Sequence, residues 1–191
     1  VYSSGDSLNH DLMTVSRKAA DTPWSKPRKL TKWQNDDLRP TVSPDGKLIA
    51  FYSDFSKGRG TRRQWNIVVI PADAKKPLGR AHLQKMAVAE DVVIDLNTGP
   101  AWSPDSRKIF FVKRDPTVFN PIYAYDLYTG RQYKFATKTK MNRDILISKV
   151  GVLSFRAQKG VWDRVYVALT NQGLQLQGGK QLPTKIHYKK L

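Results

Sequence analysis

The chain has 191 residues, and 40% of them are hydrophobic, which is enough for one globular domain with its own core. It contains no cysteine, so disulfides, thiolate metal sites and a cysteine nucleophile are excluded. Lys and Arg number 33 against 16 Asp and Glu, and the net charge of +17 favours an anionic partner: nucleic acid, an anionic lipid or lipopolysaccharide surface, or an acidic protein face. No apolar run reaches roughly 18 residues, so we expect no transmembrane segment.

The first part of the chain predicts β structure that begins partway through a unit. Residues 1–3 are typical of the end of a strand, and residues 11–15 predict a second strand after a short turn. A loop with two prolines leads to a basic, edge-like strand at residues 28–32, where lysine and proline oppose edge-to-edge association. We therefore expect the unit at residues 1–33 to lack its first strand and turn.

Residues 39–54 predict a strand, a tight turn and a second strand. The turn is Ser-Pro-Asp-Gly, in which Pro44 presets φ at the first central position and Gly46 accepts a positive φ. The Asp45 side chain can accept hydrogen bonds from nearby backbone N–H groups and so cap the turn. An apolar, β-prone run at residues 48–52 follows, as expected for a buried strand.

Two basic stretches of this second unit are the candidate contacts for an acidic partner. One is the long hairpin loop at residues 55–64, and the other follows the next predicted strand, residues 65–71. Charge complementarity at such loops steers association and selects partners. The candidate binding residues are Lys57, Arg59, Arg62, Arg63, Lys75, Lys76 and Arg80. Residues 81–86 then predict an outer strand, with a short helix as the alternative.

The strand–turn–strand pattern recurs at residues 99–115, where the turn reads Ser-Pro-Asp-Ser. Ser106 stands in the place of Gly46 and tolerates a positive φ less well, so we expect this turn to differ. Further strands are predicted at residues 121–126 and 131–135. The return of the same unit indicates a repeat architecture.

A fourth, degenerate unit without the Ser-Pro-Asp turn follows. Its strands are expected at residues 144–148, 152–155, 164–169 and 174–176, the last as the fourth strand of the unit. A glycine pair then predicts a hinge, and residues 184–188 can form one more strand. No long amphipathic helix is evident, so the predicted fold class is all-β.

These strands predict β-propeller blades, each a four-stranded antiparallel sheet. The expected divisions are a partial blade at residues 1–33, blades at 39–90 and 99–136, a degenerate blade at 142–177 and a C-terminal tail at 178–191. They supply about three and a half to four blades. Part of a larger propeller is the favoured arrangement, and the alternative is a small four-bladed ring closed by residues 184–188 beside Val1 and Tyr2.

Residues 39–54 with 66–71, and 99–115 with 122–130, resemble the WD-like blade repeat of the TolB β-propeller family. The shared pattern is a proline, an apolar or aromatic residue, the Ser-Pro-Asp turn, an apolar strand, and a later strand that ends at a glycine turn. The resemblance implies a protein-binding role in a bacterial periplasm or cell envelope. The same repeat occurs in prolyl-oligopeptidase-type enzymes, so the propeller portion of a larger hydrolase or lyase is an alternative.

Sequence motifs for catalysis or cofactor binding are not found. His10, His82 and His187 lack the spacing of metal ligands, and no G-x-S-x-G, P-loop or G-x-G-x-x-G sequence occurs. We therefore expect no catalytic residue, metal or cofactor. Asp36 and Asp37 precede the first strand of a blade, beside the central channel, and are weak candidates for binding a cation or substrate.

Four tryptophans stand near the ends of predicted strands: Trp33, Trp65, Trp102 and Trp162. We expect them to pack between blades; if exposed beside basic residues, they would instead suit stacking with single-stranded nucleic acid. The sequence therefore predicts a non-enzymatic binding or scaffold module that contacts other protein subunits of a complex. A basic nucleic-acid-binding protein is a further alternative.

Overall fold

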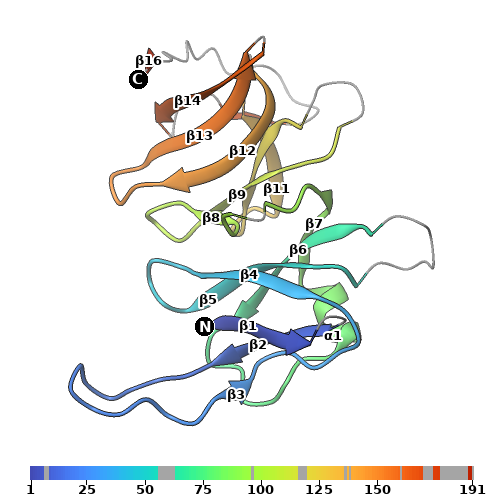
Figure 1. The fold of residues 1–191 in the computed structure, drawn as a ribbon, viewed down its shortest axis with the longest axis vertical. Coiled ribbons are helices and arrows are strands. Elements are labelled where there is room, and N and C mark those ends of the chain that lie inside the picture. Colours follow the sequence, from blue (N-terminus) through green and yellow to red (C-terminus); the bar gives the residue numbers. More distant parts are fainter. Residues whose placement is uncertain are drawn as a thin grey trace.

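The computed structural model describes residues 1–6, 9–55, 63–95, 97–115, 120–135, 137, 139–159, 161–169, 174–176 and 189–190. Within these ranges the chain forms four antiparallel sheets and one short helix, α1 (Arg80–Lys85). The sheets are stacked along the long axis of the molecule, with the first at one end and the fourth at the other (Figure 1). The fold class is all-β, as predicted. Among the described residues no helix is long and apolar enough to cross a membrane.

Strand order within each sheet follows the chain, as in the blades of a propeller. The first sheet contains β1 (Tyr2–Asp6), β2 (Asn9–Thr14) and β3 (Arg28–Lys29). The second contains β4 (Asp37–Val42), β5 (Leu48–Ser53), β6 (Trp65–Pro71) and β7 (Ala87–Val92). The third contains β8 (Ala101–Trp102), β9 (Lys108–Val112), β10 (Ile122–Asp126), β11 (Arg131–Phe135) and β15 (Leu174–Leu176). The fourth contains β12 (Lys140–Ile147), β13 (Val152–Lys159), β14 (Trp162–Leu169) and β16 (Lys189–Lys190).

Two predictions about outer strands are wrong. The outer strand expected at residues 81–86 is not formed: α1 occupies most of this range, which confirms the alternative of a short helix, and the outer strand is β7. Good helix formers fill α1, which buries Leu83. Leu174–Leu176 pairs with β11 of the third sheet, so it does not complete the degenerate unit; β16 lies beside β14 instead. The strand expected at residues 184–188 lies outside the described residues.

The four sheets form an open row, which excludes the small closed ring for the described residues. β1 pairs with β2 alone among the described strands. The first and fourth sheets lie at opposite ends of the row (Figure 1). Each end sheet therefore has one neighbouring sheet, whereas each middle sheet has two.

The two Ser-Pro-Asp turns share one hydrogen-bonding pattern. In the first, the Ser43 hydroxyl donates to Asp45 Oδ1 at 2.6 Å, and the same oxygen accepts the Lys47 N–H at 3.1 Å. Gly46 has a φ of 75° and Ser106 a φ of 59°, so both turns use the left-handed conformation. The expectation that the second turn would differ is wrong: the Ser106 hydroxyl accepts the Asp45 N–H at 3.0 Å, and this contact between turns supports the conformation.

Apolar clusters fill the spaces between successive sheets, and tryptophans take part in them. Trp65 and Trp102 are buried in the cluster between the second and third sheets, and Trp33 packs against the cluster between the first and second. Trp102 Nε1 also donates to the Thr41 carbonyl at 3.2 Å, which ties these blades together. Packing between blades is confirmed for these three, but the prediction is wrong for Trp162, which is 67% exposed.

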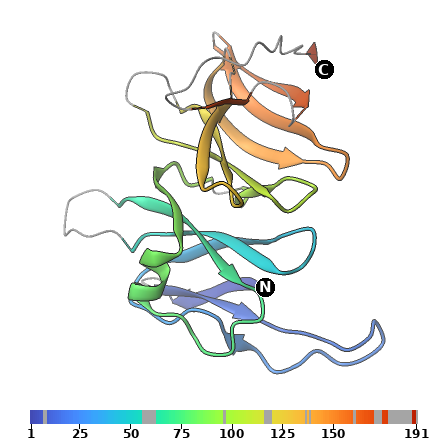
Figure 2. The same cartoon turned by 180° about the vertical axis from the view of Figure 1, so that it is seen from behind.

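The strand ends form two opposite faces. The turn face carries the connections β2–β3, β4–β5, β6–α1, β8–β9, β10–β11 and β12–β13, and the loop face carries the others. The turn face is on the left in Figure 1 and on the right in Figure 2, where α1 is seen on the other side.

Candidate functional site

The seven predicted binding residues do not form one surface. Three of them lie outside the described residues: Lys57, Arg59 and Arg62. Arg63 precedes β6 at the loop face, whereas Lys75 and Lys76 follow the other end of that strand. The seven residues of β6 span about 20 Å at about 3.3 Å per residue, so the two positions are far apart.

Arg63 is committed to carboxylates of its own chain. Its Nη1 donates to Asp36 Oδ2 at 2.6 Å, and its Nε lies 3.7 Å from Asp54 Oδ2. Its charge is therefore balanced locally, although its side chain is partly exposed. The structure assigns Arg63 a role in holding the loop face together.

Lys75, Lys76 and Arg80 lie in a second group of cations, which the structure enlarges with Arg28 and Lys32. We call these five exposed residues the basic seam, because they lie where the outer edges of the first two sheets meet. None of their side chains forms an ion pair within the described part of the chain.

Backbone and side-chain contacts hold the seam in place. Thr31 and Leu78 form a parallel bridge, in which Lys32 N–H donates to the Leu78 carbonyl at 3.0 Å. Arg28 Nη1 donates to the Ala74 carbonyl at 2.6 Å. The Arg80 guanidinium lies over the ring of Trp33, 5.0 Å from its centroid. The side chains of Arg28 and Arg80 are thus held at this edge, beside the exposed Lys32, Lys75 and Lys76.

Asp36 and Asp37 lie where the first and second sheets meet. Asp36 Oδ1 lies 2.7 Å from His10 Nδ1, and its other oxygen accepts from Arg63. Burial alone would raise the pKa of Asp36, but the hydrogen bonds from His10 and Arg63 hold it below the ordinary value. Asp36 N–H in turn donates to Asp54 Oδ1 at 2.9 Å.

Asp37 has the opposite electrostatics. It is fully buried, and its Oδ1 accepts the Ser53 hydroxyl at 2.6 Å. Burial raises the pKa of Asp37 to about 7; the hydroxyls of Ser53 and Thr31 oppose the rise, and the nearby carboxylate of Asp11 adds to it. Among the described residues, no group of three or more His, Asp or Glu side chains is arranged to hold a metal ion. The proposed cation site is therefore unsupported here, and these aspartates join two blades.

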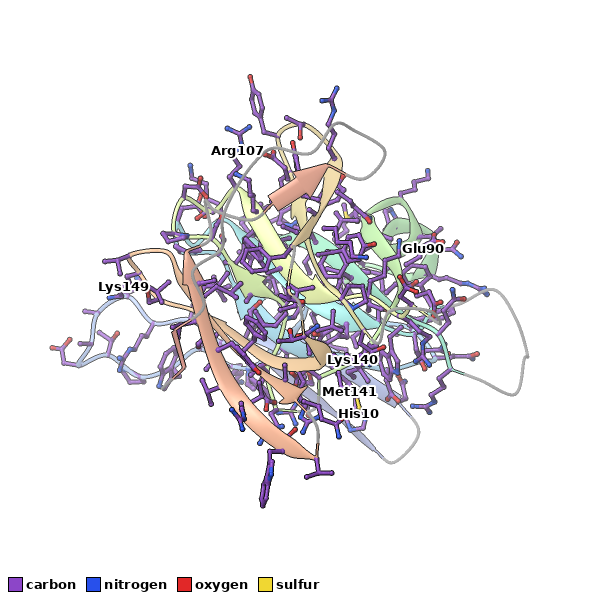
Figure 3. All side chains as sticks on the ribbon, turned by 90° about the horizontal axis from the view of Figure 1, so that it is seen from above. His10, Glu90, Arg107, Lys140, Met141 and Lys149 are labelled. Carbon is purple, nitrogen blue, oxygen red and sulfur yellow. The ribbon has the colours of Figure 1, made fainter. Side chains whose placement is uncertain are left out.

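Two hollows lie beside the first strands of the sheets. One of about 370 Å³ is bordered by β4, β8 and β12. Another of about 300 Å³ is lined by Asn120, Met141 and Asn142, among others. Met141 lies on the same side of the stack as Lys140 and His10 (Figure 3). Asn142 Nδ2 donates to the Asn120 carbonyl at 2.9 Å, so this hydrogen bond connects β12 to the segment before β10.

No protein-family model matches the sequence, and no curated protein matches it. Solved structures do match. The crystal structure of TolB from Acinetobacter baumannii has a TM-score of 0.58 at 19% identity, over 79% of this chain and 34% of that one. A TolB-type protein from Agrobacterium tumefaciens has a TM-score of 0.55 at 17% identity, over 76% and 48%. The AtxE2 isopeptidase in its apo form has a TM-score of 0.53 at 10% identity, over 87% and 31%.

This chain thus spans about a third to a half of the length of the structures that it matches. At these identities the likeness shows the fold alone. It agrees with the repeated Ser-Pro-Asp turns, the meander order of the strands and the packing of sheet on sheet. The described sheets have the fold of TolB-like β-propeller blades.

Proposed function

We propose that this chain is a non-catalytic, protein-binding module of the TolB-like propeller type, which docks an acidic face of another protein subunit through the basic seam. The proposal rests on this group of exposed cations, none of which forms an ion pair among the described residues. An acidic face opposite such a group speeds encounter and selects against wrong partners. The resemblance to TolB-type repeats supports a place for this complex in the periplasm or at the cell envelope.

The loop face contrasts with the seam, because several arginines in its described part have carboxylate partners. Arg114 Nε lies 3.4 Å from Asp91, Arg143 pairs with Asp163, and Arg156 pairs with Asp144. An acidic partner at that face would have to displace existing ion pairs. An acidic partner can bind the cations of the seam without displacing an ion pair among the described residues. This difference favours the seam as the contact surface.

The test is purification of the tagged chain with its bound subunits from its native source. Lys75→Glu with Lys76→Glu reverses the charge of the seam at two exposed positions. We expect this variant to bind the acidic subunit roughly tenfold more weakly or worse, with less dependence on salt. Arg131→Glu with Lys134→Glu is the matched control on β11 and should bind normally. Equal binding by all three proteins would rule out the seam.

A further inference from the structure

The turn face projects at two places, and each carries an exposed apolar side chain beside cations. One is the loop at residues 15–27, and the other is the turn at residues 148–151; they are the outermost points on the left of Figure 1. Trp24 in the first is 58% exposed, and Val150 in the second is 83% exposed. Neither side chain belongs to an apolar cluster between the sheets.

The projecting loop is held in one shape by its own hydrogen bonds. Its stem is the β2–β3 ladder, in which Thr14 pairs with Arg28. Ser25 N–H donates to the Ser16 carbonyl at 2.7 Å, and Ser16 N–H donates to the Ser25 hydroxyl at 3.0 Å. The Arg17 guanidinium lies over the Trp24 ring, 4.6 Å from its centroid. Trp24 is thus presented on a preorganised loop, which reduces the entropy lost on binding.

The charge around these two points is mainly positive. The loop carries Arg17, Lys18 and Lys26 against Asp21, and the turn carries Lys149. All of them are exposed. Viewed along the stack, Lys149 lies on the opposite side from Glu90, which belongs to an outer strand (Figure 3). Anions are thus attracted to the same face that presents Trp24 and Val150.

We propose that the turn face docks on an anionic lipid surface, with Trp24 and Val150 entering the head-group layer. Tryptophan beside Arg and Lys suits this layer, because its ring is apolar and its N–H remains in a polar environment. A protein interface would instead be expected to present a contiguous apolar centre, whereas Trp24 is the one large apolar side chain exposed in its loop. The residues of these two projections are not seam residues, although Lys75 and Lys76 lie on the β6–α1 connection of the same face. The proposal adds a second kind of partner.

The test is flotation of the full chain with vesicles of phosphatidylcholine, with and without phosphatidylglycerol, at low salt. We expect binding to the anionic vesicles only. Each Lys or Arg near such a surface strengthens binding about fivefold, so Lys18→Gln with Lys26→Gln should weaken it about 25-fold. Trp24→Ala should weaken it about tenfold, and brominated lipids should quench Trp24 emission in a Trp162→Phe background.

Trp162 provides the matched control. It is also exposed, at 67% against 58% for Trp24, but it begins β14 at the loop face and is followed by Asp163. Trp162→Ala should float like the wild type, and Trp24→Ala should bind the acidic subunit like the wild type, so failure here is separate from failure of the seam. Equal loss in Trp24→Ala and Trp162→Ala would overturn the proposal. The proposal would also be overturned if the chain did not bind vesicles and Trp24→Ala lost an acidic protein partner. That result would mean that the face binds protein.

Discussion

Asp36 and Asp37 are adjacent in sequence, but their surroundings shift the two pKa values in opposite directions. Burial would raise the pKa of Asp36, but hydrogen bonds from His10 and Arg63 stabilise its carboxylate, and the pKa is lowered. Asp37 faces the hydroxyls of Ser53 and Thr31 and no cation among the contacts that set its pKa, so burial dominates and its pKa is raised to about 7. The junction between the first two blades therefore contains a carboxyl group that is protonated below neutral pH.

The consequence for stability follows from the proton that Asp37 holds. In the unfolded chain its pKa is near 3.8, and in the fold it is about 7. Between these values the folded protein binds a proton that the unfolded chain has released, so the free energy of unfolding falls as the pH rises from about 4 to about 7. Asp37→Asn cannot ionise and keeps an oxygen for the Ser53 hydroxyl. We expect it to be more stable than the wild type by about 2 kcal/mol at about pH 8, and nearly equal to it at about pH 4, in urea denaturation.

Asp36→Asn is the matched control, and its effect has the opposite sign. The lowered pKa of Asp36 contributes stability above the unfolded value of 3.8, and this contribution is lost as the pH falls through the folded value. The variant should be less stable at neutral pH by about 1–2 kcal/mol, with the difference disappearing in acid. If Asp37→Asn were also less stable than the wild type at about pH 8, Asp37 would have to be ionised and stabilised in the fold.

At the residue scale, the roles of side chains whose partners are close in sequence could be predicted. The roles of side chains whose partners are far away in sequence could not. Capping by Asp45 was predicted correctly, because its partners lie within two residues. The pairing of Arg63 with Asp36 joins residues far apart in sequence, so the loop cation could not be recognised as neutralised. Likewise, the Arg28 guanidinium can donate to the Ala74 carbonyl only because the bridge between Thr31 and Leu78 joins the first and second blades.

Among the elements, the contact between the second and third blades depends on a close approach at Gly99. A Cβ at this position would lie 2.4 Å from the Arg39 carbonyl oxygen and 2.5 Å from Thr41 Cγ2. The backbone must move to accept it, and the Thr41 hydroxyl would lose its bond to the Pro100 carbonyl, now 2.6 Å long. We expect Gly99→Ala to lower the free energy of unfolding by about 2 kcal/mol or more.

Gly79→Ala is the control for this glycine, and both variants are compared by thermal and urea unfolding. A Cβ there would meet the Lys32 carbonyl oxygen at 3.8 Å, an ordinary contact, and φ is −97°. The change should therefore cost less than about 1 kcal/mol. Similar losses in the two variants would contradict the idea that the close approach at Gly99 limits how the blades meet.

The same contrast between local and distant information explains which elements were predicted. Strands β5, β6, β9 and β10 follow apolar runs beside characteristic turns, and they were found at the expected places. Helix α1 has six residues, too few for a helical period to distinguish it from a strand. The pairing of β15 with β11 is a tertiary choice between two possible sheet edges, and the local sequence does not specify it.

For the whole molecule, the repeat correctly indicated propeller blades, but the order of the row depends on packing between sheets. Among the residues that the structure describes, apolar clusters cover the middle sheets on both sides and the end sheets on one side. The buried residues of β5 and β9 illustrate this, since their side chains contribute to clusters on both sides of their sheets. The two ends of the row therefore have less packing to hold them than the centre.

This difference predicts a gradient of local stability along the row. Backbone amides open with free energies that follow local packing, so we expect hydrogen exchange to be slowest in β5, β6, β9 and β10. Exchange should be faster in β13 and fastest in β1 and β3, where the first sheet has three strands and one covered face. Exchange measured by mass spectrometry on peptides from each strand gives the order. Uniform protection would mean that the row opens as one cooperative unit, and slow exchange in β1 would mean that the outer face of the first sheet is covered in solution.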